Sequence, residues 1–599
     1  MATSLEALLT RLEAAKNRFG PGTAAEVKSL LVQLVGSKFD DPPSLIRFHE
    51  ALLFLRAFPQ DASVVVAAED LLDAFHERVE RVRQRGADMS DFDDFDTSGI
   101  AGTTMQDTLS FEAARWLVRR IPRSVETAWD EYADDYHAER AMGATWPRFM
   151  PLLREDSDVE ANIPWQRWLD TARGRERDSE WFIRQFEQLA VSQRERDELY
   201  DSLRIPLRWH LDNLKLSRTR NWSRPRQFYI HDQPLLMRSQ VSLADELAKP
   251  SPRLTPLSRS KGDAVIEKIR EVMLVRYREL YGTTLGDPGS VARADLGRGV
   301  VIHLWNLPPE RRLPLRAYVA GFTLKNGVPI NYIEAIGLCE WIEVGFNTFY
   351  TYRQGETAWI YAQALRCLCG LMGAKTISVY PYQIGQNNDE AIDSGAFWFY
   401  RKLGFRCGRP DLEQLAKREE ARIAADKRYR TPRRTLKRLS EAHVFYELQE
   451  TGKGTTSSRA VCDAKMTSAS AAKGGPGAWD TFSTRNLGLR VNRRMAREFG
   501  GNAAQIGAGS VKEVARALGI NPDRWTSPER SSLENWSLVL TLIPDLERWS
   551  RQEKRQMIQI IRAQSASNEM RYLRLTQRHP RLREALLRLG SRSPRSAAS

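Results

Sequence analysis

The sequence predicts an α+β (α/β) protein in which a central mixed sheet has helices on both faces and is flanked by mostly α-helical N- and C-terminal regions. Residues 1–247 and 479–590 carry apolar side chains at three- and four-residue spacing, which is typical of amphipathic helices. Residues 299–352 instead contain short runs rich in valine, isoleucine, tyrosine and phenylalanine, which are typical of strands. Stretches rich in proline, serine or glycine separate these regions.

Length and composition indicate a multidomain globular protein. A chain of 599 residues exceeds what one hydrophobic core usually serves and suggests about three or four domains. The 42% of hydrophobic and 28% of charged residues are typical of globular proteins. No apolar run reaches the roughly 18 residues that span a bilayer, so no membrane partner is expected.

The net charge of +14 allows a nucleic-acid partner, because basic surface attracts polyanions. The 76 acidic residues nearly balance the 90 basic ones, however, and solvated helix faces are the preferred explanation. The N-terminus lacks the unbroken apolar core of a signal peptide. Cysteines are sparse and odd in number, which predicts neither a zinc site nor a disulfide framework and indicates a reduced, cytoplasmic protein; they are Cys339, Cys367, Cys369, Cys407 and Cys462.

Two compositional shifts predict the domain boundaries. The Pro/Ser-rich stretch "AKPSPRLTPLSRSKGD" at 248–263 is expected to link the first helical region to the centre of the chain. Residues 451–478, rich in glycine, serine, threonine and alanine, are expected to form a flexible linker before the C-terminal helices. The tail 591–599 is expected to be disordered.

The central region begins with a predicted helix, "AVIEKIREVMLVRYRELYG", and continues with β-rich runs at 299–307, 315–338 and 341–352. Asn326-Gly327 supplies a hairpin turn inside the second run. A helix "ETAWIYAQALRCLCGLMG", a short strand "KTISVYPY", a second helix and two final strands follow. The first of these helices is expected to place six side chains on one face: Ala358, Tyr361, Ala362, Leu365, Leu368 and Met372. This order predicts one mixed sheet and not a series of βαβ repeats.

The second of these helices ends in an aromatic signature, Ala396-x-x-Phe399-Tyr400-x-Lys402-Leu403-Gly404-Phe405. With this signature and the order of elements, residues 264–450 resemble the GNAT superfamily of acyl-CoA-dependent N-acyltransferases. In that family a strand runs into a phosphate-cradling turn and helix, and a further strand leads to a helix that ends in a Tyr-x-x-x-Gly-Phe pattern. The corresponding pieces are "WIEVGFNTFY", "YRQGETAWIYAQALR", "TISVYPYQ" and "AFWFYRKLGF". The resemblance covers about a third of the chain, and its closing signature is moderately specific.

The resemblance implies transfer of an acyl (acetyl) group from acetyl-CoA or another acyl-CoA to an unidentified amine, by direct attack and without a metal. Two adjacent parallel strands would separate to admit the pantetheine arm, and Tyr400 would protonate the departing thiolate. The pyrophosphate of CoA would lie at a helix N-terminus, where unpaired N–H groups attract anions. The residues implied in CoA binding are Arg353, Gln354, Gly355, Glu356, Thr357, Ala358 and Asn388.

An acyltransferase of this kind also needs a base for the acceptor ammonium. Glu343, on the presumed strand before the turn, is the candidate, and Glu340 and Glu334 are further choices. Burial near a cleft would raise the pKa of such a carboxyl towards neutrality. His303 and His443 lie on predicted strands without metal-ligand spacing and are expected to pack or to form hydrogen bonds.

The sequence departs from the family pattern at the turn. Gly355 and Ala358 are one residue too far apart, and Glu356 stands where a pyrophosphate would approach, with Arg353 as a compensating cation. Asp393 stands where the family often has asparagine. The alternative hypothesis is therefore a catalytically inactive, GNAT-shaped binding or scaffold protein, because a fold by itself does not determine function.

Residues 417–439 form the most basic stretch of the chain. They could contact a phosphate-rich ligand, either the CoA nucleotide or an RNA backbone. A solvated helix with mixed charges is the slightly favoured interpretation, because only one aromatic residue lies among the cations. The cations concerned are Arg430, Arg433, Arg434, Lys437 and Arg438.

Overall fold

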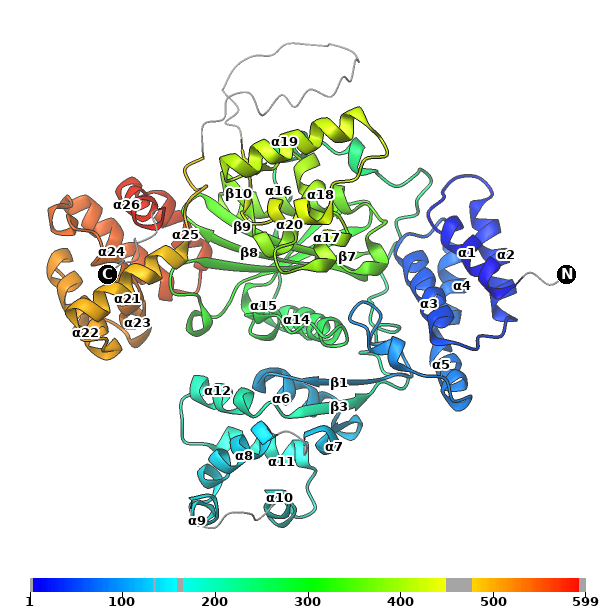
Figure 1. Cartoon of the computed structure of the whole chain (residues 1–599), viewed down its shortest axis with the longest axis horizontal. Helices are drawn as coiled ribbons and strands as arrows, with labels where there is room; N and C mark the ends of the chain where they lie inside the picture. Colours follow the sequence, from blue (N-terminus) through cyan, green and yellow to red (C-terminus); the bar gives the residue numbers. More distant parts are fainter. Residues whose placement is uncertain (1–3, 133–135, 159–164, 449–476, 592–599) are drawn as a thin grey trace.

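A computed structural model describes residues 4–132, 136–158, 165–448 and 477–591. It shows a mixed α/β protein in which helices pack on both faces of a nine-stranded sheet (Figure 1). The expected fold class is confirmed at this level. Among the described residues, no helix combines the length and the apolar character required to cross a membrane.

The strand order in the large sheet is β11-β12-β10-β9-β8-β7-β6-β5-β4. Neighbouring strands are antiparallel except β9 and β10, which are parallel. The bounds are β4 (Thr255–Pro256), β5 (Ala292–Gly297), β6 (Val300–Trp305), β7 (Ala317–Lys325), β8 (Val328–Leu338), β9 (Trp341–Thr348), β10 (Thr376–Val379), β11 (Arg406–Cys407) and β12 (Val444–Glu447).

The turn between β7 and β8 is the one that the sequence predicts. Asn326 and Gly327 have φ values of 49° and 78°, the left-handed backbone that this type of hairpin turn requires. A Cβ atom at Gly327 would lie 1.7 Å from the carbonyl oxygen of Ser223, so glycine is also needed for the close approach of another segment.

Helix α16 (Thr357–Met372) follows β9 and lies on one face of the sheet with α17 (Asp389–Asp393) and α18 (Ala396–Lys402), whereas α14 (Arg259–Leu274) and α15 (Tyr281–Thr284) cover the other face (Figure 1). α16 ends at Gly373, whose φ of 68° is typical of a helix C-cap. All the side chains expected on its inner face are buried: Ala358, Tyr361, Ala362, Leu365, Leu368 and Met372.

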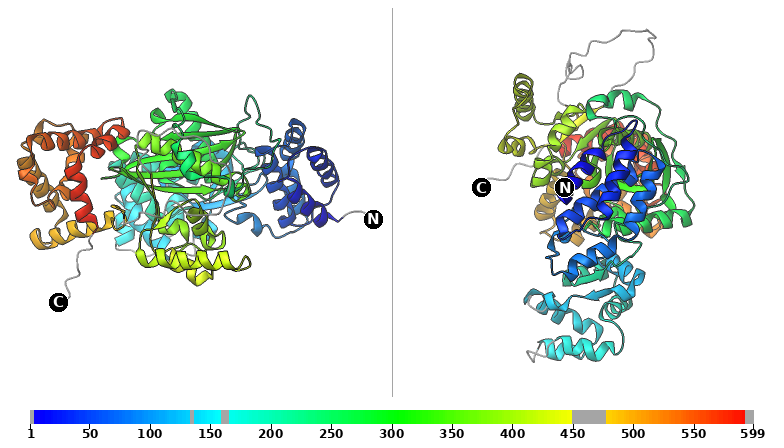
Figure 2. Two further views of the ribbon diagram at one scale, coloured as in Figure 1. Left: turned by 90° about the horizontal axis from the view of Figure 1, so that it is seen from above. Right: turned by 90° about the vertical axis from the view of Figure 1, so that its right-hand side faces the viewer.

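Helical regions flank the sheet at both ends (Figures 1 and 2). The N-terminal helices are α1 (Leu5–Ala15), α2 (Thr23–Val35), α3 (Pro42–Ala57), α4 (Ala62–Asp73) and α5 (Phe75–Gln84). The C-terminal helices are α21 (Thr484–Glu498), α22 (Ala503–Leu518), α23 (Ser527–Leu540), α24 (Arg551–Ser565), α25 (Glu569–Gln577) and α26 (Pro580–Gly590).

The buried apolar residues of both flanks are continuous with those of the large sheet. One cluster of buried apolar residues extends from Leu8 in α1, through the large sheet, to Leu589 in α26. The N-terminal helices pack on one another, α1 on α2 and α3 on α4, and so do α22, α23 and α24 in the C-terminal region, and the shared cluster joins both groups to the sheet.

Residues 104–210 form the one lobe that has a separate core among the described residues. It contains a three-stranded antiparallel sheet of order β1-β3-β2, so the N-terminal region is not purely helical. The elements are β1 (Thr104–Thr108), α6 (Phe111–Arg120), β2 (Val125–Thr127), α7 (Trp129–Tyr132), α8 (Tyr136–Phe149), α9 (Leu153–Asp158), α10 (Trp165–Arg173), α11 (Asp178–Gln188), α12 (Gln193–Leu203) and β3 (Pro206–His210).

The expected linker 248–263 is part of the folded centre. Its residues Thr255 and Pro256 form β4, which pairs with β5 at the edge of the sheet, and α14 begins at Arg259. Proline is tolerated in an edge strand because its missing N–H group has no ladder partner to serve. The expected linker 451–478, except for its last two residues, and the tail 592–599 lie outside the described residues.

Candidate functional site

The parallel strands β9 and β10 separate after a short paired segment. Their register pairs Trp341 with Thr376 and ends with Glu343 opposite Ser378, whereas β9 itself continues to Thr348. The backbone of β9 beyond Glu343 therefore has β8 on one side and no β10 partner on the other. The site implied by the family resemblance lies around this gap.

The turn at the start of α16 is organised by a buried ion pair. The Glu356 side chain is fully buried, where it pairs with the Arg298 guanidinium and accepts a hydrogen bond from the Leu236 N–H at 3.1 Å. It makes no side-chain capping hydrogen bond to α16. Glu356 thus points into the protein and does not occupy the position expected to compete with a phosphate group.

The N-terminal region closes one side of the same turn. A Cβ atom at Gly355 would lie 2.6 Å from Cζ of Phe58, which follows α3, so the glycine is required by this close contact. The exposed Gln354 accepts a hydrogen bond from Asn17 Nδ2 at 2.8 Å, and Ala358 is buried. The turn is therefore closed on this side, because Phe58 packs there.

The remaining residues of the implied CoA site make contacts within the chain. Arg353 pairs with Glu390 of α17. The Thr357 hydroxyl donates to the Arg353 carbonyl at 3.2 Å. Asn388 caps α17 by accepting the Ala391 N–H at 3.1 Å, which gives it a local structural role. These residues therefore lie near the start of α16, where hydrogen bonds and an ion pair with other residues of the chain hold their side chains in place.

Tyr400 lies in the aromatic core beside α16. Its ring centroid is 5.6 Å from that of Tyr361 and 5.7 Å from that of Phe405, and 4% of the residue is exposed. Burial raises the pKa of the Tyr400 phenol above its usual value. The ring centroid of Tyr361 is in turn 4.8 Å from that of Phe346, which lies in the part of β9 without a β10 partner. The Tyr361 hydroxyl is buried without a hydrogen-bond partner among the described residues.

Glu343 lies at the last paired position of β9 and contacts two cations or potential cations. One carboxylate oxygen is 2.9 Å from His443 Nε2, and the other accepts a hydrogen bond from Arg316 Nη1 at 3.3 Å. Burial by itself would raise the pKa of Glu343, but the contacts with His443 and Arg316 outweigh it and lower that pKa. The expected shift towards neutrality is wrong, because the sequence does not reveal these partners.

The two further carboxylates are also engaged. Glu334 accepts a hydrogen bond from the Tyr318 hydroxyl, and burial raises its pKa. Burial would raise the pKa of Glu340 too, but hydrogen bonds from Arg583 and from Trp479 at 2.8 Å lower it. Sequence reasoning missed these partners, since Trp479 and Arg583 lie in the distant C-terminal region and only the fold brings them here.

No metal centre is found within the described part of the chain, where no group of three histidine, cysteine, aspartate or glutamate side chains is placed to hold an ion. Burial lowers the pKa of His303 to about 4, which is consistent with the expected packing role. The cysteines that the structure describes, Cys339, Cys367, Cys369 and Cys407, are all unpaired thiols, and Cys462 lies outside the described residues.

The basic stretch is largely folded into α19 (Pro410–Ala425) and α20 (Arg433–Leu439). Arg433 forms ion pairs with Asp389, at 2.8 Å, and with Asp393, and Lys437 lies 3.0 Å from Asp389. These ion pairs neutralise part of the positive charge of the basic stretch, which leaves less of it for a polyanion.

Comparison of the chain with protein-family models, with curated proteins and with solved structures finds no match in any of the three.

Proposed function

We propose that the chain is an N-acyltransferase-like protein that transfers an acyl group from an acyl-CoA to an amine within the gap between β9 and β10. The observation that carries the proposal is the separation of this parallel pair beyond Glu343 and Ser378. A pantetheine arm has amide groups that could pair with the free edge of β9 as another strand would. This edge matches the slot that the family resemblance implies.

The start of α16 supports binding of the CoA phosphates. The helix has no side-chain cap, so its first N–H groups lack a side-chain acceptor and the positive end of its dipole would favour an anion. Arg298 neutralises Glu356 and holds it away, which removes the main objection raised by the sequence. Arg353 adds a cation whose partner Glu390 is partly exposed and can exchange with a phosphate.

The proposed reaction needs an acid and a base on opposite sides of the thioester. The acceptor nitrogen attacks the carbonyl carbon, the C–N bond forms and the C–S bond breaks. The nitrogen loses a proton to Glu343, assisted by His443, and the sulfur leaves with the phenolic proton of Tyr400. Tyr400 is protonated at neutral pH, as a general acid must be, and the rise of its pKa on burial makes it a weaker acid than a free tyrosine.

Calorimetry and a thiol-release assay on the full chain test this proposal. Acetyl-CoA should bind saturably, and free CoA should be released faster in the presence of a panel of primary amines. Tyr400→Phe should lower this rate by roughly 10²–10⁴-fold with acetyl-CoA affinity changed far less. Tyr446→Phe, another partly buried tyrosine near Phe405, is the matched control and should retain the rate.

A GNAT-shaped binding protein without acyl transfer is the second candidate, and the packing of Phe58 against Gly355 favours it. If acetyl-CoA does not bind to the full chain, the N-terminal region closes the phosphate turn and this second function replaces the first. If acetyl-CoA binds but Tyr400→Phe leaves the rate unchanged, the assigned acid is wrong.

A further inference from the structure

A large cleft lies apart from the gap described above, where three parts of the chain meet. Its volume is about 1070 Å³, which exceeds what one small amine fills. One wall comes from α6 and α12 of the lobe with the separate core, and a second from α15 and residues 309–314 before β7. The third wall comes from α23 and the end of α24.

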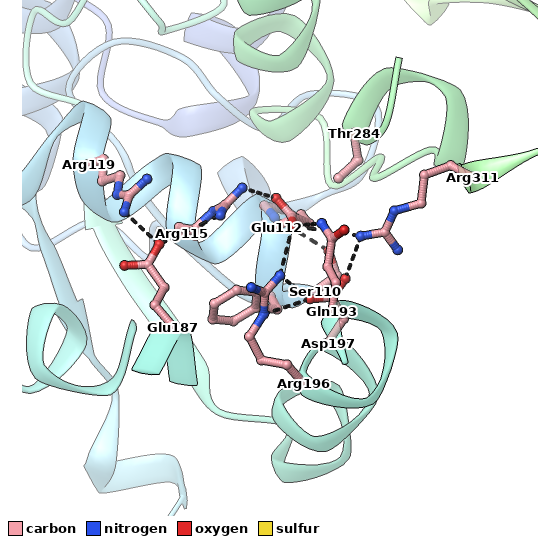
Figure 3. A network of polar contacts seen from close by, with 12 residues as sticks. Ser110, Glu112, Arg115, Arg119, Glu187, Gln193, Arg196, Asp197, Thr284 and Arg311 are labelled. Carbon is pink, nitrogen blue, oxygen red and sulfur yellow. Dashed lines mark hydrogen bonds and ion pairs between the residues drawn. The ribbon is translucent and has the colours of Figure 1, made fainter. Parts of the chain in front are cut away.

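The first two walls of this cleft are rich in carboxylates. Six carboxylates line the cleft against three guanidinium groups, those of Arg194, Arg311 and Arg312. Figure 3 shows part of the resulting network, in which Arg196 lies 2.7 Å from Asp197 and 3.3 Å from Glu112. The six acidic residues are Glu112, Asp197, Glu198, Asp201, Glu279 and Glu310.

Glu112 and Asp197 are paired with Arg115, Arg196 and Arg311, whereas the described residues supply no ion pair to Asp201, Glu279 or Glu310. Burial, and then the negative charges of Glu279, Asp197 and Glu112, raise the pKa of Asp201, against a hydrogen bond from the Phe111 N–H that lowers it. A cationic group in the cleft would reduce this repulsion and stabilise the ionised carboxylates. The charge of the cleft therefore favours a ligand that carries positive charge.

An unpartnered acceptor in the cleft gives an independent indication of a ligand. Gln564 lines the cleft and is 5% exposed. Its Nε2 donates to the carbonyl oxygens of Leu313 and Pro314, but its Oε1 has no hydrogen-bond partner in the described structure. A buried acceptor without a partner is unfavourable, so a ligand that supplies an N–H donor would be stabilised here.

The third wall offers neutral hydrogen-bonding groups. Its side chains carry hydroxyl and amide groups, which both donate and accept hydrogen bonds. They therefore suit the N–H and C=O groups of a peptide backbone better than a polyamine, which has only methylene and ammonium groups. They are Ser527, Ser531, Ser532, Asn535 and Ser565.

We propose that the cleft binds an extended peptide segment bearing lysine or arginine side chains. Its cationic side chains face the carboxylates of α6 and α12, and its backbone contacts the serine and amide wall and Gln564. The inference concerns binding alone and does not depend on acyl transfer.

Titration of the full chain with a fluorescent peptide that alternates alanine and lysine tests the proposal. Saturable binding that weakens with added salt is expected, whereas the same peptide with glutamate in place of lysine should not bind. No saturation by the lysine peptide, or equal binding of the glutamate peptide, would overturn the proposal. Tighter binding of spermine than of the peptide would overturn the assignment of the peptide class.

Asp201→Asn is the decisive variant, because the amide oxygen of asparagine can still accept the Phe111 N–H. It should weaken peptide binding by about 5-fold or more, while Glu198→Gln, at the exposed rim, should weaken it by about 2-fold. Glu195→Gln lies on α12 outside the cleft and is the matched control. Equal affinities of Asp201→Asn and this control, with unchanged melting temperatures, would contradict the proposed site.

Discussion

Glu356 and Glu343 are two carboxylates of the same sheet region, and they differ in their burial and in their charged partners. Glu356 is completely buried and paired with Arg298, and the buried Lys325 donates a hydrogen bond to the Arg298 carbonyl oxygen. Glu343 keeps 14% of its side chain exposed and contacts the His443 imidazole where two strands separate.

The comparison teaches that residue type and predicted strand position do not assign a role. The sequence analysis places Glu356 at the implied phosphate turn, where it would compete with a pyrophosphate, and gives Glu343 as the candidate base. The first has a permanently charged partner and no access to solvent, which suits a structural ion pair. The second keeps some contact with solvent and lies beside the gap between β9 and β10, where a ligand could reach it.

The largest expected effect comes from breaking the buried pair. Arg298→Ala leaves the Glu356 carboxylate buried without its guanidinium, which should lower the free energy of unfolding by about 3–5 kcal/mol. Urea denaturation would measure the change. Arg293→Ala, an exposed arginine on the neighbouring strand β5, should change it by less than about 0.5 kcal/mol. Similar losses of unfolding free energy for the two variants would show that the buried Arg298–Glu356 pair stabilises the fold no more than an exposed arginine does.

The next effect is a pH dependence from Lys325, which lies behind the same pair. Its Nζ is 2.7 Å from His231 Nε2, and burial, opposed by Glu356 and assisted by Arg298, lowers its pKa to about 7. The unfolded lysine has a pKa of about 10.4, so between these values the unfolded chain binds the extra proton and stability rises with pH.

From pH 7 to pH 9 we therefore expect the free energy of unfolding to increase by roughly 1–3 kcal/mol from this group. Lys325→Met should remove most of that increase, which urea denaturation at several pH values would measure. An unchanged pH slope in the variant would mean that Lys325 is protonated throughout this range.

Glu343 should produce a smaller pH dependence of stability, in which stability is lost as the pH falls into the acidic range. Its folded pKa is lowered, so its stabilising contribution is present above the unfolded value of about 4.3 and is lost as the pH falls through the folded pKa. Glu343→Gln should lower the free energy of unfolding at pH 7 by about 1 kcal/mol and flatten the loss below pH 4.5. If the variant loses stability by the same amount at pH 3 as at pH 7, the charge of Glu343 is not the cause.

The smallest expected effect concerns Tyr361, whose hydroxyl is buried without a partner. Tyr361→Phe removes an unsatisfied polar group from a packed site, so stability should stay within about 0.5 kcal/mol of the original or increase slightly. Thermal unfolding in the absence of acetyl-CoA would measure this. A loss of more than about 1 kcal/mol would reveal a hydrogen bond of this hydroxyl.

Local patterns in the sequence predicted much of the central region. The Asn326-Gly327 turn and the buried face of α16 depend on residues close together in the chain, and both are confirmed. The lobe sheet was missed because β1 and β3 are short strands whose partners lie about a hundred residues apart. For the candidate site, the sequence proposed Glu343 and Tyr400, but it did not point to their neighbours Arg316, Tyr318 or Phe58, which come from other elements.

By itself, the sequence determined the class of the protein, the periodic helices and strands, and the turn chemistry, because these depend on propensities and spacing within a few residues. Only the tertiary structure decided that the flanks share one core with the sheet and that Glu356 faces Arg298 while Glu343 faces His443. The physical reason is that burial and charge partners arise from packing between distant segments, and these set the pKa and the accessibility of each group.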